Sequence, residues 1–171
     1  MNKVLLAFLL LYSSTLFAEE IVFDMSVFGF TFGKMVLTKT KENDSTELYT
    51  LVAKGKTNFL WMKRKDETYY QVRYRNGKLF SSSYTQIESG VTKHWTKILF
   101  DGKKYLVDSY RGKRSFTEAP DYSVLILYFK PDFKRNKVFY EAESEFIELK
   151  YKDANTIEQK SPDGSKTIYR F

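Results

Sequence analysis

The chain has 171 residues, of which 43% are hydrophobic, 18% aromatic and 29% charged, and its formal net charge is +7. This balance excludes global disorder and provides enough apolar material for the core of one domain. Because there is no cysteine and only one histidine, His94, the sequence also excludes a disulfide scaffold, a thiolate metal site and a cysteine nucleophile.

The first eighteen residues have the layout of a secretory signal peptide. Lys3 precedes an apolar run from Val4 to Leu11, and Ala18 provides a small residue before the expected cleavage site. The run is too short to cross a bilayer as a helix, which takes about 20 residues. We predict a signal peptide over 1–18, one β-rich domain over 19–171, and a periplasmic or secreted product. No cysteine follows the run, so no lipid anchor is expected, and we expect no transmembrane span.

Glycine-containing turns recur along the chain. Four of these glycines follow one another at intervals of 13, 12 and 10 residues: Gly77, Gly90, Gly102 and Gly112. Turns with positive φ at glycine connect neighbouring antiparallel strands. We predict that Asn76-Gly77 and Asp101-Gly102 form two-residue hairpin turns.

Between these turns, apolar and polar residues alternate with the period of two that is typical of a sheet covered on one face. Tyr70, Val72 and Tyr74, for example, alternate with Gln71 and Arg73. We therefore expect a mainly β protein built as a single curved antiparallel meander, either a half-barrel or an open barrel. The predicted strands are 20–29, 33–41, 46–56, 67–75, 78–88, 91–100, 103–110, 113–117, 137–141, 145–152, 156–160 and 166–171.

A large apolar surface interrupts the strand pattern at Phe59, Leu60, Trp61 and Met62, directly before three basic residues at 63–65. Tryptophan beside basic residues is favoured at a membrane interface. Two interpretations stay open. These four residues form either a strand end or short helix that packs on the core, or an interface loop that contacts lipid or a partner.

Few residues in the strands suggest catalysis. His94 would need a nucleophile and an orienting acid nearby. The serines at 81–83 lie in no Gly-x-Ser-x-Gly elbow. Their small side chains fit tight positions in a sheet or, alternatively, the open wall of a cavity. We predict no catalytic residue, no metal, no cofactor and no enzymatic activity.

The segment between Pro120 and Pro131 differs from the rest, because residues 124–129 are all apolar. Such a run fits a buried short helix or a buried strand. We favour a helix near 121–129, capped by Asp121 and ended by Pro131. It would lie across the concave face of the sheet, against aromatic side chains near 70–74 and 105–107. The candidate ligand-pocket residues are Tyr70, Val72, Tyr74, Tyr105, Leu125 and Tyr128.

Two charged clusters have both a simple and a functional interpretation. Glu141, Glu143 and Glu145 alternate, and we favour a solvated acidic face over a calcium site. Basic residues at 103–104 and 111–114 would lie on neighbouring strands. They form either a stripe that binds phosphate or sulfate, or charges that protect sheet edges from aggregation.

Several motifs together resemble an uncharacterised family. They are the run 70–79, the segments 81–84, 100–102 and 111–117, the pairs Tyr122-Ser123 and Tyr128-Phe129, and the turn 161–164. In this order they resemble a domain-of-unknown-function family of exported bacterial β-rich proteins. The resemblance implies a curved antiparallel sheet like those of periplasmic lipoprotein carriers and lipocalin-like half-barrels, and it brings no catalytic residues with it.

Two functions are compatible with these features. The first is an exported soluble binding or carrier protein for a lipid or another hydrophobic small molecule. The alternative is a non-enzymatic structural or interaction component of a cell-envelope assembly. The positive charge suits an anionic envelope surface, whereas nucleic acid is not an expected partner. A cavity lined by Phe and Tyr would favour the first function, and a large exposed apolar patch the second.

Overall fold

The computed structural model describes residues 18–27, 30–59, 62–153, 155–160, 164 and 166–170. The fold is mainly β, as predicted, and all twelve predicted strands are confirmed. They are β1 (Ala18–Val27), β2 (Phe30–Asn43), β3 (Thr46–Phe59), β4 (Met62–Arg75), β5 (Lys78–Glu88), β6 (Val91–Phe100), β7 (Tyr105–Ser109), β8 (Gly112–Phe116), β9 (Lys137–Tyr140), β10 (Glu145–Asp153), β11 (Thr156–Lys160) and β12 (Lys166–Arg170).

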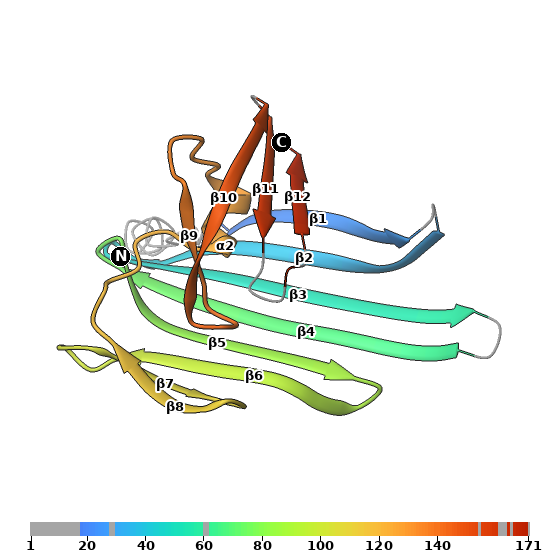
Figure 1. The fold of residues 1–171 in the computed structure, drawn as a ribbon, viewed down its shortest axis with the longest axis horizontal. Coiled ribbons are helices and arrows are strands. Elements are labelled where there is room, and N and C mark those ends of the chain that lie inside the picture. The colour runs from blue at the N-terminus through green and yellow to red at the C-terminus, as the bar shows by residue number, and fades with distance from the viewer. Residues whose placement is uncertain are drawn as a thin grey trace, which may run out of the picture.

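Eight of the strands form one large sheet in their order along the chain, from β1 to β8, and each pair is antiparallel (Figure 1). The predicted antiparallel meander is confirmed in these eight strands, and it is not closed into a barrel, since β1 and β8 lie at its two edges. The last four strands separate from it. They form a second sheet in the order β12-β11-β10-β9.

The alternation seen in the sequence becomes the two faces of the large sheet. Leu37, Leu51 and Tyr70 pair in register across β2, β3 and β4, and all three are buried. Their sequence neighbours point to the opposite face, where Tyr69 is 37% exposed. The buried face is therefore the one that the rest of the chain covers.

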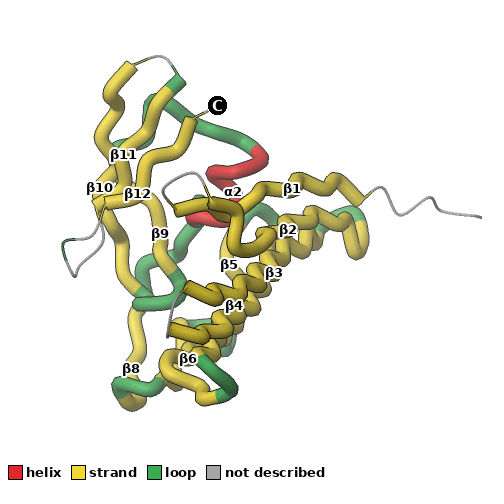
Figure 2. Tube along the Cα trace, turned by 90° about the vertical axis from the view of Figure 1, so that its right-hand side faces the viewer, coloured by secondary structure: helices red, strands yellow, loops and turns green. Residues whose placement is uncertain are grey.

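Figure 2 shows what covers it: the second sheet faces one side of the large sheet, and the helix lies between them. Thr96 of β6 donates a hydrogen bond to the carbonyl of Ala142, which lies between β9 and β10, over 2.6 Å. In Figure 1 the right-hand half of the large sheet extends beyond this second layer. The protein thus has two layers at one end and a single sheet at the other.

The predicted short helix is confirmed as α2 (Val124–Phe129), and its first four residues are buried. The predicted cap is wrong, because Ser123 rather than Asp121 occupies the N-cap and accepts a hydrogen bond from the backbone N–H of Ile126. The helix packs on the β1–β3 side of the sheet, where the Phe129 ring lies 5.6 Å from that of Tyr49.

The two predicted hairpin turns have different outcomes. Asn76 and Gly77 join β4 to β5 as a two-residue turn with φ of 51° and 71°, as predicted. The prediction for Asp101-Gly102 is wrong, because four residues separate β6 from β7. The Asp101 carboxylate accepts hydrogen bonds from the backbone N–H groups of Lys103 (2.8 Å) and Lys104 (2.9 Å) and so organises a longer turn.

Candidate ligand-binding cleft

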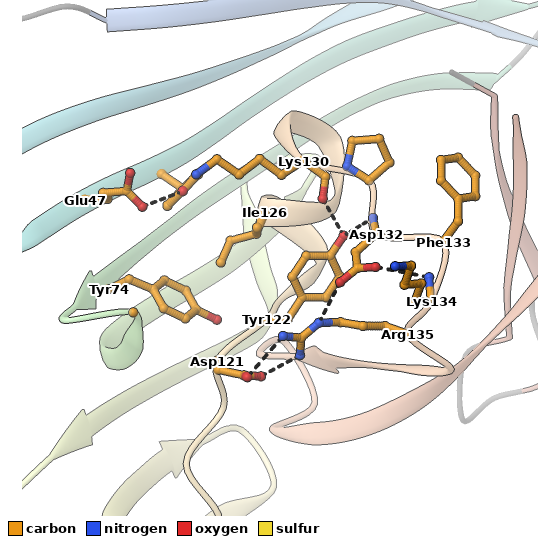
Figure 3. A pocket seen from close by; sticks show the side chains of 13 residues that line it. Glu47, Tyr74, Asp121, Tyr122, Ile126, Lys130, Asp132, Phe133, Lys134 and Arg135 are labelled. Carbon is orange, nitrogen blue, oxygen red and sulfur yellow. Dashed lines mark hydrogen bonds and ion pairs between the residues drawn. The ribbon is translucent and has the colours of Figure 1, made fainter.

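A cleft of about 530 Å³ opens beside α2 at the two-layered end of the protein (Figure 3). Its lining comes from β3, β4, the β4–β5 turn and the chain on either side of the helix. The lining residues are Glu47, Tyr49, Tyr74, Gly77, Asp121, Tyr122, Ile126, Lys130, Pro131, Asp132, Phe133, Lys134 and Arg135. More of its wall is apolar than polar.

Three tyrosines form the rigid part of this wall. Tyr49 and Tyr74 meet edge to face, with ring centroids 6.2 Å apart, and both are almost completely buried. The Tyr122 hydroxyl donates to the carbonyl of Lys130 (2.6 Å) and accepts from the N–H of Asp132 (3.0 Å), so it ties the two ends of the helical segment together. Burial raises the pKa of Tyr122 to about 12 and that of Tyr49 further, so both are neutral.

The charges around the cleft compensate one another. Arg135 binds Asp121 through two hydrogen bonds of 2.7 and 3.1 Å and also reaches Asp132 at 3.2 Å (Figure 3). The Arg135 guanidinium holds the pKa of Asp121 below its ordinary value. With three carboxylates and three basic side chains in its lining, the cleft has no net charge. A ligand without a strong net charge suits it best.

The core also holds a buried carboxyl group, Glu141, whose side chain is completely inaccessible to solvent and whose charge acts on the Tyr74 hydroxyl. The Tyr70 hydroxyl donates a hydrogen bond to Oε2 of Glu141, whereas Oε1 and the Tyr74 hydroxyl have no partner of normal hydrogen-bond geometry. Loss of solvation raises the pKa of Glu141 to about 7, although the Tyr70 hydrogen bond and the nearby Ser123 hydroxyl lower it. Glu141 does not line the cleft, but the core that holds Tyr74 thus contains a carboxyl group able to hold a proton.

The predicted pocket residues lie in the core, but they do not line one common cavity. Tyr70, Val72 and Leu125 are buried among the residues of the main core, and Tyr128 is half-buried at its edge. Tyr74 lines the cleft beside α2. The sixth residue, Tyr105, is also buried and lines a second cleft. The aromatic face of the sheet could be predicted from the sequence. Which of its residues line a cleft depends on how the second layer packs against it.

The acidic cluster is arranged differently from the prediction. Residues 141–144 form a turn rather than extended strand, so the carboxylates do not share a solvated face. Glu141 points into the core, while Glu143 pairs with Arg111 (2.6 Å) and Glu145 with Arg114 (3.3 Å). Within the described residues, no group of three acidic or histidine side chains is placed to hold a metal ion.

The other candidate residues are His94, the serines and the predicted interface loop. His94 is half-buried with its ring centroid 4.5 Å from that of Tyr110, and Ser82 is buried in β5. Neither residue lines the cleft beside α2. Of the predicted interface loop, Leu60 and Trp61 lie outside the described residues, and Phe59 and Met62 pair through their backbones at the ends of β3 and β4.

Sequence reasoning missed the chain that follows the helix. Asp132, Phe133 and Arg135 lie in a polar stretch after the helix that, in the sequence, resembles an ordinary loop. A weak signal was present, since Asp121 and Arg135 flank the apolar run with opposite charges. In the structure the two residues form an ion pair at the cleft, which links the chain before the helix to the chain after it.

The fold and the cleft together define a two-layered, open-sheet β protein with an aromatic-walled cleft beside its single described helix. Within that class, the chain belongs to the family described as Domain of unknown function (DUF6134), whose model matches residues 23–171. No curated protein and no solved structure matches the chain. In the described part of the chain, no helix has the length and apolar character needed to span a membrane.

Proposed function

We propose that the protein is an exported binding protein, periplasmic or secreted, for a lipid or another hydrophobic small molecule. The observation that carries the proposal is the cleft of about 530 Å³ walled by Tyr49, Tyr74, Tyr122 and Phe133. Ligand sites are concave, mostly apolar and about 300–1,000 Å³ in volume. The cleft has these properties, and its buried tyrosines make much of it preformed.

The polar groups of the cleft support binding rather than catalysis. Arg135, Asp121 and Asp132 engage one another, so none of them is left as a reactive group beside the ligand. Their network holds the segment after the helix against the segment before it, and so keeps the cleft in shape. The ligand would lie against the tyrosine rings, with its polar end at the charged rim.

Titration with N-phenyl-1-naphthylamine, an uncharged fluorescent probe, tests this function directly. The mature protein should bind the probe saturably, and the Phe133→Asp variant should bind it about tenfold more weakly, because the apolar contact of one aromatic ring is lost. Leu106→Asp is the matched control, since Leu106 (41% exposed) and Phe133 (37% exposed) are similarly accessible, and Leu106 does not line the cleft. A wild-type protein that does not take up the probe would overturn the proposal.

One observation favours a second candidate, a non-enzymatic component of an envelope assembly. The single-layered end of the large sheet presents exposed apolar side chains where β2 and β6 begin: Phe30 is 76% exposed and Val91 56% exposed. β3 ends and β4 begins at this same end (Figure 1), with Phe59 and Met62 of the predicted interface loop as their last and first residues. Flotation with vesicles that contain an anionic phospholipid tests it, and a Phe30→Ser/Val91→Ser variant should float less than wild type.

A further inference from the structure

A second cleft, of about 610 Å³, borders the same β4–β5 turn as the first. It opens between that turn, the β6–β7 turn and the chain that leaves β8. The lining residues are Arg75, Asn76, Lys78, Leu79, Phe80, Phe100, Asp101, Gly102, Lys103, Tyr105, Thr117 and Ala119. None of them lines the first cleft, so the two are separate sites.

The base of this second cleft is apolar and fixed in place. Leu79 and Tyr105 are each only 1% exposed, and the Tyr105 hydroxyl donates to the backbone carbonyl of Leu79 over 3.0 Å. The Phe100 ring packs 4.9 Å from that of Tyr105. Because the one hydroxyl of these side chains is already hydrogen-bonded, the base offers a ligand mainly carbon surface.

An irregularity in β5 shapes the rim. The register with β4 shifts between Arg73 and Tyr74, so that Phe80 is an extra residue between two paired neighbours. Such a bulge redirects a side chain out of the regular alternation. The Arg75 guanidinium lies over the Phe80 ring, 3.7 Å from its centroid, and the ring therefore holds this cation at the rim.

The charges of the second cleft are not compensated, in contrast to those of the first. Arg75, Lys78 and Lys103 face a single carboxylate, that of Asp101. The backbone N–H groups of Lys104 and Lys103 occupy this carboxylate and hold its pKa below the ordinary value. Across the described ranges, none of the three cations has an acidic partner.

We propose that the second cleft binds an anionic amphiphile, a small molecule with a phosphate or carboxylate headgroup and an apolar chain. The headgroup lies among Arg75, Lys78 and Lys103, and the chain lies on Phe80, Phe100 and Tyr105. Exposed cations alone give weak binding in water, so the aromatic base supplies the second part of the affinity. This site goes beyond the proposed function, because it is a different cleft that favours an anionic ligand, whereas the first cleft suits a ligand without a strong net charge.

Isothermal titration calorimetry with decyl phosphate, below its micelle concentration, tests the proposal. Wild-type protein should bind it saturably, and the triple variant Arg75→Gln/Lys78→Gln/Lys103→Gln should bind it about tenfold or more weakly, because all three charged contacts with the headgroup are lost. The matched control Lys97→Gln/Lys150→Gln/Lys160→Gln has the same net charge and replaces exposed cations outside the cleft. It should bind like wild type.

Three results would overturn the proposal: equal affinity for decyl trimethylammonium, inorganic phosphate binding as tightly as decyl phosphate, or equal weakening in the triple variant and its control. The variants also separate this site from the first cleft. The triple variant should keep its affinity for N-phenyl-1-naphthylamine, and Phe133→Asp should keep its affinity for decyl phosphate. The two proposals can therefore be refuted separately.

Discussion

Replacing the buried carboxyl group by an amide, in Glu141→Gln, should remove much of the pH dependence of stability. Glutamine has nearly the same shape, and its amide oxygen still accepts the hydrogen bond that Tyr70 donates to Glu141. It cannot ionise, however. The variant therefore isolates the cost of holding a charge at a position that is fully buried.

The magnitude follows from the two protonation equilibria. The ordinary pKa of the carboxyl is 4.5, and burial raises it to about 7 in the folded protein. Between these values the folded state keeps a proton that the unfolded state has lost, so the free energy of unfolding falls as pH rises through this window. At 1.36 kcal/mol per pKa unit, the fall approaches about 3 kcal/mol at pH 8. Glu141→Gln should not show it.

Urea unfolding at pH 4.5, 6 and 8, followed by circular dichroism, measures the effect. Relative to wild type, Glu141→Gln should gain about 3 kcal/mol between pH 4.5 and pH 8, which corresponds to about 6–12 °C in melting temperature for a chain of this size. Glu148→Gln is the control, because Glu148 is exposed on β10 and its replacement should leave the pH profile unchanged.

A difference between wild type and Glu141→Gln that stays constant from pH 4.5 to pH 8 would refute the reasoning. It would mean that the folded protein solvates this carboxylate as well as water does. A pH profile that Glu148→Gln alters equally would refute it too, since the effect would then belong to the net charge and not to the buried site.

Three further predictions concern the same core and its turns. Tyr70→Phe removes a hydrogen bond that lowers the pKa of Glu141, so this pKa should rise above about 7, as read from the carboxyl band in infrared titration. Gly102→Val should cost about 1–2 kcal/mol in urea unfolding through backbone strain alone, because Gly102 has φ of +98° and nothing lies within 4 Å of the position of an added Cβ; an unchanged unfolding midpoint would contradict this. Leu125→Asp should cost several kcal/mol or keep its carboxyl protonated at neutral pH, because Leu125 is fully buried in α2, and probe binding in the first cleft should fall with stability.

The strands could be predicted from the sequence because their determinants are local. Alternation at Tyr70, Val72 and Tyr74 sets which face is buried, and the Asn76-Gly77 pair has the backbone preference that a two-residue hairpin needs. The same rule was wrong at Asp101, because the aspartate side chain accepts two backbone N–H bonds and stabilises a longer turn.

The clefts and the buried carboxyl could not be predicted, because they depend on how the second layer packs. Glu141, Glu143 and Glu145 look equivalent in the sequence. Because residues 141–144 form a turn, Glu141 points into the core, whereas Glu143 and Glu145 form ion pairs with arginines. Likewise, Tyr74 and Arg135 are 61 residues apart in the chain and line one cleft. No periodicity within a strand contains that information.

Because the two layers follow one another along the chain, the entropy cost of pairing the strands of the large sheet is separate from the entropy cost of docking the second layer. Every pairing in the large sheet joins neighbours in sequence, so each strand closes a short loop onto the one before it. The contacts between layers close much longer loops: Thr96 reaches Ala142 across 46 residues, and Tyr70 reaches Glu141 across 71. The entropy of chain closure is therefore concentrated in the docking of the C-terminal layer, and until residues 122–157 arrive, the apolar face around Leu37 and Val72 has no cover. Before that layer docks, this apolar face is open to other molecules, which is the condition under which partly folded chains aggregate.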